Sequence, residues 1–230
     1  MIDKIIIGDA LKELPLMGSD SVDVGITSPP YNRKRNDKYA EYDDCIEDYY
    51  GFLKSIIDEM IRICRRWVFF NIQATYYNRQ DVYKLIGDYA DRIQNIIIWN
   101  KKNPMPANAL NITNAYEFII VFGDEPLQAQ HTYIQNFIST SVNNDMPEEH
   151  KAVMPTEVAG WLISSFTKEE DVILDCFFGT GTTGYVAKQL GRHYIGIEIV
   201  EKYAQYAKER IDGTFKASTP NQLSIEDFML

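Results

Sequence analysis

A serine, two prolines and a tyrosine follow one another at Ser28-Pro29-Pro30-Tyr31, just after the apolar run 21–24. That run is typical of a short buried strand. Neither proline has a backbone N–H, so the chain must leave the sheet there in a stiff, extended turn. The turn offers a hydroxyl, backbone carbonyls and an aromatic ring. Such a set suits a flat ligand with amino hydrogens, because oxygens accept the N–H groups while the ring stacks on the face.

A second group of chemically useful residues follows the apolar run that ends at Asp175. It is the glycine-rich turn Cys176-Phe177-Phe178-Gly179-Thr180-Gly181-Thr182. Glycines let the backbone approach a ligand closely, and the start of the next helix offers free N–H groups. Glu198 ends a later predicted strand, where a carboxylate can accept both ribose hydroxyls of a nucleoside cofactor. The turn also satisfies the dinucleotide pattern G-x-G-x-x-G, so a nucleotide-dependent oxidoreductase is an alternative at this point.

Together the two groups resemble the DNA amino-methyltransferases, which move a methyl group from S-adenosylmethionine to the exocyclic nitrogen of cytosine or adenine. The catalytic loop of that family is Ser, Asp or Asn, then Pro-Pro and an aromatic residue. Its cofactor loop is Asp-x-Phe-x-Gly-x-Gly, and Cys176 departs from the proline most common at its position. The catalytic loop comes first here, as in the β arrangement of the family, found in bacterial or phage restriction–modification systems.

The resemblance implies roles for the matching residues. Ser28, Pro29, Pro30 and Tyr31 would be catalytic, with the target amine bonded to Ser28 Oγ and the Pro29 carbonyl, and with Tyr31 stacked on a flipped-out base. The methyl donor would contact residues from both ends of the chain: Asp9, His150, Pro155, Asp175, Phe177, Gly179, Gly181, Thr182 and Glu198. Asp9 would lie near the adenine of the donor, and a role as helix N-cap is compatible with that position.

Periodicity and motif order predict an α/β fold with a doubly wound, mostly parallel sheet of the S-adenosylmethionine-dependent methyltransferase type. Strands are expected at 5–7, 21–24, 67–72, 95–99, 117–122, 171–175 and 194–199. Helices are expected at 50–64, 83–89, 156–166, 185–190 and 200–211. Residues 1–212 would form a single methyltransferase domain with short target-recognition insertions around 33–48 and 101–149, and 213–230 would be a loose tail.

The 230-residue chain has a formal net charge of −10, which argues against simple nucleic-acid binding because phosphates attract basic surfaces. Contact with double-stranded DNA therefore requires a local basic patch, for which the candidates are Arg33, Lys34, Arg35, Lys38, Lys101 and Lys102. A small acidic domain has little surface for reading DNA. We therefore expect a homodimer or a complex with a separate partner subunit.

No apolar run is long enough to span a bilayer, and the first residues lack the features of a signal peptide, so a cytoplasmic location is expected. The three cysteines and three histidines are widely scattered, which favours reduced thiols and no metal site.

The residue before the two prolines bears on the target base. In the family that the motifs resemble, Thr-Ser-Pro-Pro with an aromatic is associated with cytosine N4. An acid or amide at the serine position is the usual adenine-N6 form. The stretch from Thr27 to Tyr31 therefore favours cytosine N4, with adenine N6 as the alternative. A third possibility is an inactive partner subunit of a methyltransferase, which the acidic charge favours and the two intact loops oppose.

Overall fold

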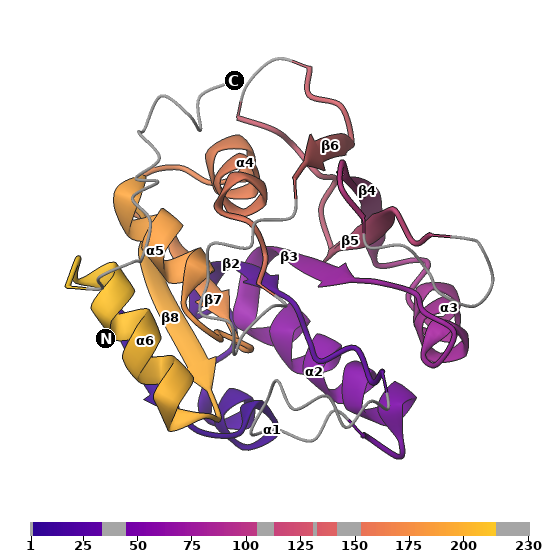
Figure 1. The fold of residues 1–230 in the computed structure, drawn as a ribbon, viewed down its shortest axis with the longest axis horizontal. Coiled ribbons are helices and arrows are strands. Elements are labelled where there is room, and N and C mark those ends of the chain that lie inside the picture. Colours follow the sequence, from indigo (N-terminus) through magenta and orange to yellow (C-terminus); the bar gives the residue numbers. More distant parts are fainter. Residues whose placement is uncertain (1, 34–44, 105–112, 131–132, 142–152, 215–230) are drawn as a thin grey trace.

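The computed structural model describes residues 2–33, 45–104, 113–130, 133–141 and 153–214. Their strands form one eight-stranded sheet in the order β1-β8-β7-β2-β3-β5-β4-β6 (Figure 1). The strands are β1 (Lys4–Ile7), β2 (Val22–Thr27), β3 (Cys64–Ile72), β4 (Ile93–Lys101), β5 (Tyr116–Gly123), β6 (Phe137–Thr140), β7 (Val172–Asp175) and β8 (His193–Glu198). The helices are α1 (Ala10–Glu13), α2 (Tyr49–Ile63), α3 (Arg79–Asp88), α4 (Thr156–Phe166), α5 (Thr182–Gln189) and α6 (Glu201–Ile211), with a 3₁₀ turn over Leu14–Leu16.

The predicted doubly wound, mostly parallel sheet is confirmed. Among the described strands, only β5 runs antiparallel to its neighbours, β3 and β4. From β2 the chain crosses over α2 to β3, whereas from β7 it crosses over α5 to β8 on the other side. The strand order therefore reverses between β7 and β2. In open α/β sheets, ligands bind at the carboxyl ends of the strands at such a reversal.

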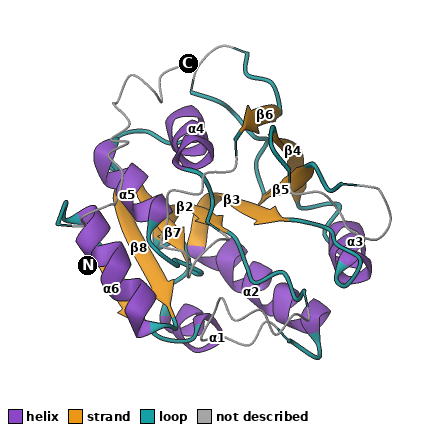
Figure 2. Ribbon diagram, in the orientation of Figure 1, coloured by secondary structure: helices purple, strands orange, loops and turns teal. Residues whose placement is uncertain are grey.

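Side chains alternate across the sheet and build two cores, one on each face. On β3, Val68 and Phe70 pack with the helices α1, α2 and α3, whereas Trp67 and Phe69 pack with α4, α5 and α6. Figure 2 shows the helices lying on the two sides of the strands. This period-two alternation of apolar residues on both faces is expected of a sheet covered by helices on each side.

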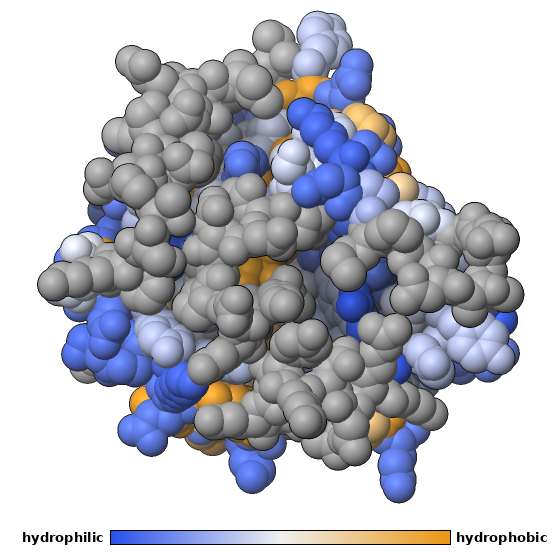
Figure 3. All heavy atoms as spheres, viewed as in Figure 1, coloured by the Kyte–Doolittle hydropathy of each residue, from blue (hydrophilic) through white to orange (hydrophobic). Residues whose placement is uncertain are grey.

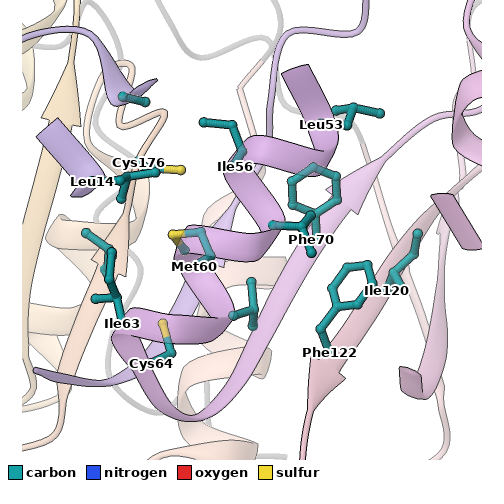
Figure 4. Packing of buried hydrophobic residues seen from close by; sticks show 14 of the residues in the cluster. Leu14, Leu53, Ile56, Met60, Ile63, Cys64, Phe70, Ile120, Phe122 and Cys176 are labelled. Atoms are coloured by element: carbon teal, nitrogen blue, oxygen red, sulfur yellow. The ribbon is translucent and has the colours of Figure 1, made fainter. Parts of the chain in front are cut away.

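Helix α2 forms because its start is capped and its apolar residues recur at helical spacing. The Asp48 side chain accepts a hydrogen bond from the Gly51 amide at 2.9 Å. Leu53, Ile56 and Met60 are fully buried and face Phe70 of β3 and Cys176 beyond β7 (Figure 4). Burying each such side chain contributes about 1.5–3 kcal/mol. This packing fixes α2 beneath the end of β2, where the proline turn begins.

Several elements differ from the expectation. Strand β2 extends to Thr27, because Val24 to Thr27 pair in register with β3. Helix α3 begins at Arg79 rather than at 83. The short strand β6 lies within the insertion around 101–149, where the only expected strand was 117–122, and it pairs with β4 at one edge of the sheet. None of the helices in the described part of the chain is long and apolar enough to cross a membrane.

Candidate active site

The two predicted loops lie side by side where the strand order reverses. Strand β2 pairs with β7, so the ends of both strands meet at one edge. Thr27, the last residue of β2, donates a hydrogen bond from Oγ1 to Asp175 Oδ1 at 2.8 Å. Asp175 ends β7, and its other oxygen accepts from Thr183 Oγ1 of α5 at 2.7 Å. The acid of the cofactor loop is thus bonded to the residue that precedes Ser28.

Two side chains fix the proline turn by donating hydrogen bonds to its backbone carbonyls. Tyr49 at the start of α2 donates its phenol hydrogen to the Pro30 carbonyl at 2.6 Å. Asn78 Nδ2 donates to the Tyr31 carbonyl at 2.9 Å. Asn32 has a φ of 50°, so the turn ends in the left-handed region that Asn tolerates better than most residues. The backbone of the turn is therefore fixed by the protein itself.

A hydrogen-bonded cluster surrounds Ser28 and Tyr31. Tyr31 donates its phenol hydrogen to Glu117 Oε2 at 2.6 Å, and its oxygen lies 3.1 Å from Ser28 Oγ. Asn71 Nδ2 contacts the Tyr31 oxygen at 2.9 Å and Glu117 Oε2 at 2.8 Å. Glu117 Oε1 forms an ion pair with Lys101, and both side chains are largely buried. These five residues come from the proline turn and from β3, β4 and β5.

Burial alters the acidity of several groups at this edge, Tyr31 and Asp175 among them. Desolvation, and then the charge of Glu117, raise the pKa of Tyr31 well above its usual value, so this phenol keeps its proton at neutral pH. Desolvation also raises the pKa of Asp175 to about 6, against the opposing hydrogen bonds from Thr183, Thr27 and the Phe177 amide. Titratable groups with strongly shifted pKa values in a cleft are typical of functional sites.

The cofactor loop has the shape expected for a nucleoside-binding turn. Gly179 and Gly181 have φ values of 53° and 76°, and a Cβ on Gly181 would lie 2.6 Å from Ala207. Glu198 accepts the Gly179 amide at 2.6 Å and the Val200 amide at 2.8 Å. The Thr180 hydroxyl is buried and has no hydrogen-bond partner within the described residues. A cradle of glycines with a spare hydroxyl and a carboxylate fits a nucleoside ligand.

The other predicted cofactor residues lie at the same edge or in support of it. Asp9 follows β1, whose last residue pairs with Glu198, and it caps α1 by accepting the Leu11 amide at 3.0 Å. Pro155 directly precedes α4 and is buried. The Phe177 ring packs on Phe52, and the Thr182 hydroxyl accepts from Arg210 of α6. His150 lies outside the described residues.

The predicted basic patch is only partly described, and one of its members needs correction. Arg33 lies over the Tyr31 ring, 5.4 Å from its centroid, and donates to Gln73 Oε1 at 3.1 Å. Lys102 is exposed. Lys101 does not lie on the surface, because its side chain turns inward to the Glu117 carboxylate. Lys34, Arg35 and Lys38 lie outside the described residues.

Sequence reasoning did not single out Asn71, Asn78 or Glu117. Asn71 interrupts the apolar run of β3, and Glu117 begins the apolar run of β5, so each was a polar residue in a strand. Both are buried, with exposed fractions of 2% and 4%. Polar residues in otherwise apolar strands were the available signal, because buried polar groups must find partners.

Glu198 gives the first testable prediction. We expect Glu198→Ala to weaken S-adenosylmethionine binding by about 1–3 kcal/mol, because a hydrogen-bonding carboxylate is lost and two loop amides lose their acceptor. Isothermal titration calorimetry measures this directly. Glu201→Ala, which removes an exposed carboxylate from the first turn of α6, is the matched control. Equal donor affinity in both variants would remove Glu198 from the donor site.

The chain is similar to known DNA methyltransferases in sequence and in fold. A family model described as DNA methylase, which covers N6 and N4 methyltransferases, matches residues 22–209. The chain is 28% identical over 264 aligned positions to the type II methyltransferase M.HinfI of Haemophilus influenzae. That alignment covers 98% of this chain and 71% of M.HinfI.

Two solved structures are similar in fold. The PvuII DNA methyltransferase, described as cytosine-N4-specific, superposes with a TM-score of 0.75 at 18% identity, covering 100% of this chain and 90% of that one. M1.HpyAVI in complex with S-adenosylmethionine gives a TM-score of 0.67 at 23% identity, covering 91% and 98%. With most of its length matched by the family model, the chain belongs to the N6/N4 DNA methylase family, which takes its methyl group from S-adenosylmethionine.

Proposed function

We propose that this protein transfers the methyl group of S-adenosylmethionine to the N4 amine of a cytosine flipped out of double-stranded DNA. The observation that carries the proposal is the bond between Thr27 and Asp175, which joins the catalytic loop to the donor loop. Because both loops leave neighbouring strands at one edge, a base held at Ser28 would lie beside a donor held by the glycine turn. Positioning of this kind can supply much of the rate of a transfer reaction.

The chemistry rests on the amine of the base. Its lone pair is delocalised into the ring, so it is a poor nucleophile. Hydrogen bonds from the amine to Ser28 Oγ and to the Pro29 carbonyl would favour a more tetrahedral nitrogen whose lone pair points at the donor methyl. S-adenosylmethionine would supply an activated methyl group when bound and leave as S-adenosylhomocysteine, and the methylated amine would give up one proton. A base inside the duplex cannot reach these acceptors, so it must be extruded and would stack on Tyr31.

The rim of the site offers groups suited to DNA. Tyr76, Tyr77 and Tyr116 are exposed, and Arg79 lies over the Tyr76 ring at 4.9 Å from its centroid. Asn78, which directly follows Tyr76 and Tyr77 in the chain, donates a hydrogen bond to the Tyr31 carbonyl. These two tyrosines therefore adjoin the catalytic loop. Aromatic rings with nearby arginines are the usual means of binding unstacked bases. Hydrophilic side chains lie along parts of the edge of the face seen in Figure 3.

We further propose that the protein acts as a homodimer or with a separate partner subunit. The net charge of −10 supports this, because a single acidic domain presents little basic surface to DNA. We also propose that the insertions around 33–48 and 101–149 take part in recognising the target sequence.

The target base is the second prediction. We expect DNA incubated with the protein and isotopically labelled donor to yield labelled N4-methylcytosine in nucleoside mass spectrometry. The serine of Thr27-Ser28-Pro29-Pro30-Tyr31 favours cytosine, whereas adenine offers the same amine to the same acceptors and is the alternative. Label on N6-methyladenine alone would replace cytosine with adenine and leave the site unchanged. A Ser28→Ala sample processed in parallel controls for contaminating methyltransferases.

A further inference from the structure

A buried ion pair lies behind the catalytic loop. Glu117 stands near the start of β5 and Lys101 ends β4, and their side chains are only 5% and 13% exposed. Removing two charges from water is costly, and an ion pair offsets that cost only when its geometry and hydrogen bonds are good. Such a pair adjoining a candidate active site calls for a functional explanation.

The carboxylate fixes the direction of the bonds that it receives. An ionised carboxylate can only accept hydrogen bonds. Tyr31 must therefore point its hydrogen at Glu117 Oε2, 2.6 Å away, and Asn71 must turn its Nδ2 to the same atom. The Asn71 orientation leaves Oδ1 buried without a partner within the described residues. The amide thus faces the carboxylate at the expense of its own oxygen.

The direction of the Tyr31 hydrogen bond determines the direction of the bond between Tyr31 and Ser28. Because the Tyr31 hydrogen is engaged, the Tyr31 oxygen meets Ser28 Oγ as an acceptor at 3.1 Å. The Ser28 hydrogen then has two acceptors, the Tyr31 oxygen and the backbone carbonyl of Asn71 at 3.3 Å. Asn71 Nδ2 also lies 3.3 Å from Ser28 Oγ, so its two hydrogens are shared among this oxygen, Glu117 Oε2 and the Tyr31 oxygen. The Ser28 hydrogen therefore points into the protein, and one lone pair is left for a ligand.

We propose that Glu117 sets the direction of the hydrogen bonds running through Tyr31 to Ser28, so that Ser28 meets the target amine as an acceptor. Glu117 is a positioning residue in this scheme, because it acts through Tyr31 and does not touch the base. The inference rests on the proposed function of Ser28. It differs from that function in naming a residue on another strand that determines how the serine behaves.

The test is a pair of substitutions and their combination. Glu117→Gln keeps the shape of the side chain, but its amide nitrogen can donate a hydrogen bond to the Tyr31 oxygen. The phenol hydrogen could then turn toward Ser28, and the serine hydrogen could turn toward the ligand. Tyr31→Phe removes the phenol, and Ser28 can still donate to the Asn71 carbonyl. We expect Glu117→Gln to lower the single-turnover rate at least tenfold and Tyr31→Phe to lower it less, both with donor affinity within twofold of wild type.

The double variant distinguishes an effect of Glu117 on hydrogen-bond direction from a merely structural role. If Glu117 acts through the phenol, Glu117→Gln with Tyr31→Phe should be faster than Glu117→Gln alone and should match Tyr31→Phe. A merely structural Glu117 would make the losses add, so a double variant slower than either single variant would overturn the inference. A wild-type rate in Glu117→Gln would do the same.

Two further arms guard the conclusion. Glu117→Gln combined with Lys101→Met removes both charges. It should stay as slow as Glu117→Gln if the loss comes from the direction of the hydrogen bonds and not from an unpaired Lys101. A wild-type rate in this combination overturns the inference. Wild-type protein that binds the donor but methylates no DNA refutes the proposed function, and the inference with it. An active wild type, an inactive Ser28→Ala and an unaffected Glu117→Gln refute the inference alone.

Discussion

Ser28→Ala is expected to lower the rate of methyl transfer by about 100-fold or more, the usual size of the effect when one preorganised hydrogen-bonding group is removed from a reacting centre. The affinity for S-adenosylmethionine should stay within twofold. Ser28 lies at the end of β2 and bonds to Tyr31 and Asn71, whereas the donor loop is held through Asp175 and Glu198. The loss should therefore fall on the chemical step.

Rapid-quench measurement of a single turnover reports that step, and calorimetry reports donor binding. Ser55→Ala is a matched control, because it removes a serine hydroxyl that bonds only within α2, to the Gly51 carbonyl at 2.8 Å. If Ser28→Ala transfers methyl groups as fast as Ser55→Ala, then Ser28 has no part in the reaction. A large loss of donor affinity would instead place Ser28 in the donor site.

Asp175→Asn is expected to stabilise the fold at neutral pH while weakening donor binding. Burial raises the pKa of Asp175 from 3.8 to about 6, so between these values the folded chain holds a proton that the unfolded chain has released. Stability rises with pH only where the unfolded state binds more protons, and here the folded state binds more. The contribution of Asp175 therefore makes stability fall as pH rises from about 4 to about 6.

Above that window the carboxylate is buried in its charged form. Raising the pKa from 3.8 to about 6 corresponds to a cost of roughly 3 kcal/mol, and Asp175→Asn should recover a large part of that free energy. Urea unfolding at a series of pH values should show the variant more stable than wild type at pH 7.5. The difference should shrink toward pH 4.5, where wild-type Asp175 is protonated and resembles an amide. A stability difference independent of pH would contradict the assignment. Asp171→Asn, which interrupts the ion pair with Arg66, serves as a control with the opposite expected sign.

The loops were predictable because each motif is contiguous in the chain and follows a strand. A parallel sheet brings the carboxyl ends of its strands to one edge, so the sequence order of Ser28 and Asp175 sufficed to place them together. Glu117 could not be placed in that way. Its strand runs antiparallel, so its first residues, not its last, reach the functional edge. Nothing local in Tyr116–Gly123 indicates that direction.

The prediction that α3 begins at residue 83 was wrong for a similar reason. Asn78 precedes α3 but makes no capping bond with its side chain, which instead holds the Tyr31 carbonyl and the Gln73 carbonyl. Helix-start signals presume that the residue serves its own helix. Lys101 was misread for the same kind of reason, because a lysine at a strand end is usually solvated, and only the opposing Glu117 turns it inward.

The connection from β4 to β5 is closed firmly at its base. Asn100 pairs with Tyr116, the Lys101 amide donates to the Ala115 carbonyl at 2.7 Å, and Lys101 is bound to Glu117. With both ends fastened, lengthening the stretch between them costs little, about 0.6 kcal/mol for each doubling. We therefore expect insertions, deletions or exchanges between Lys102, whose amide donates to the Thr140 carbonyl of β6, and Ala115 to leave the sheet and the serine in place. Because we propose that this stretch takes part in target recognition, we expect grafting it between relatives to change the recognition sequence while the catalytic loop stays the same.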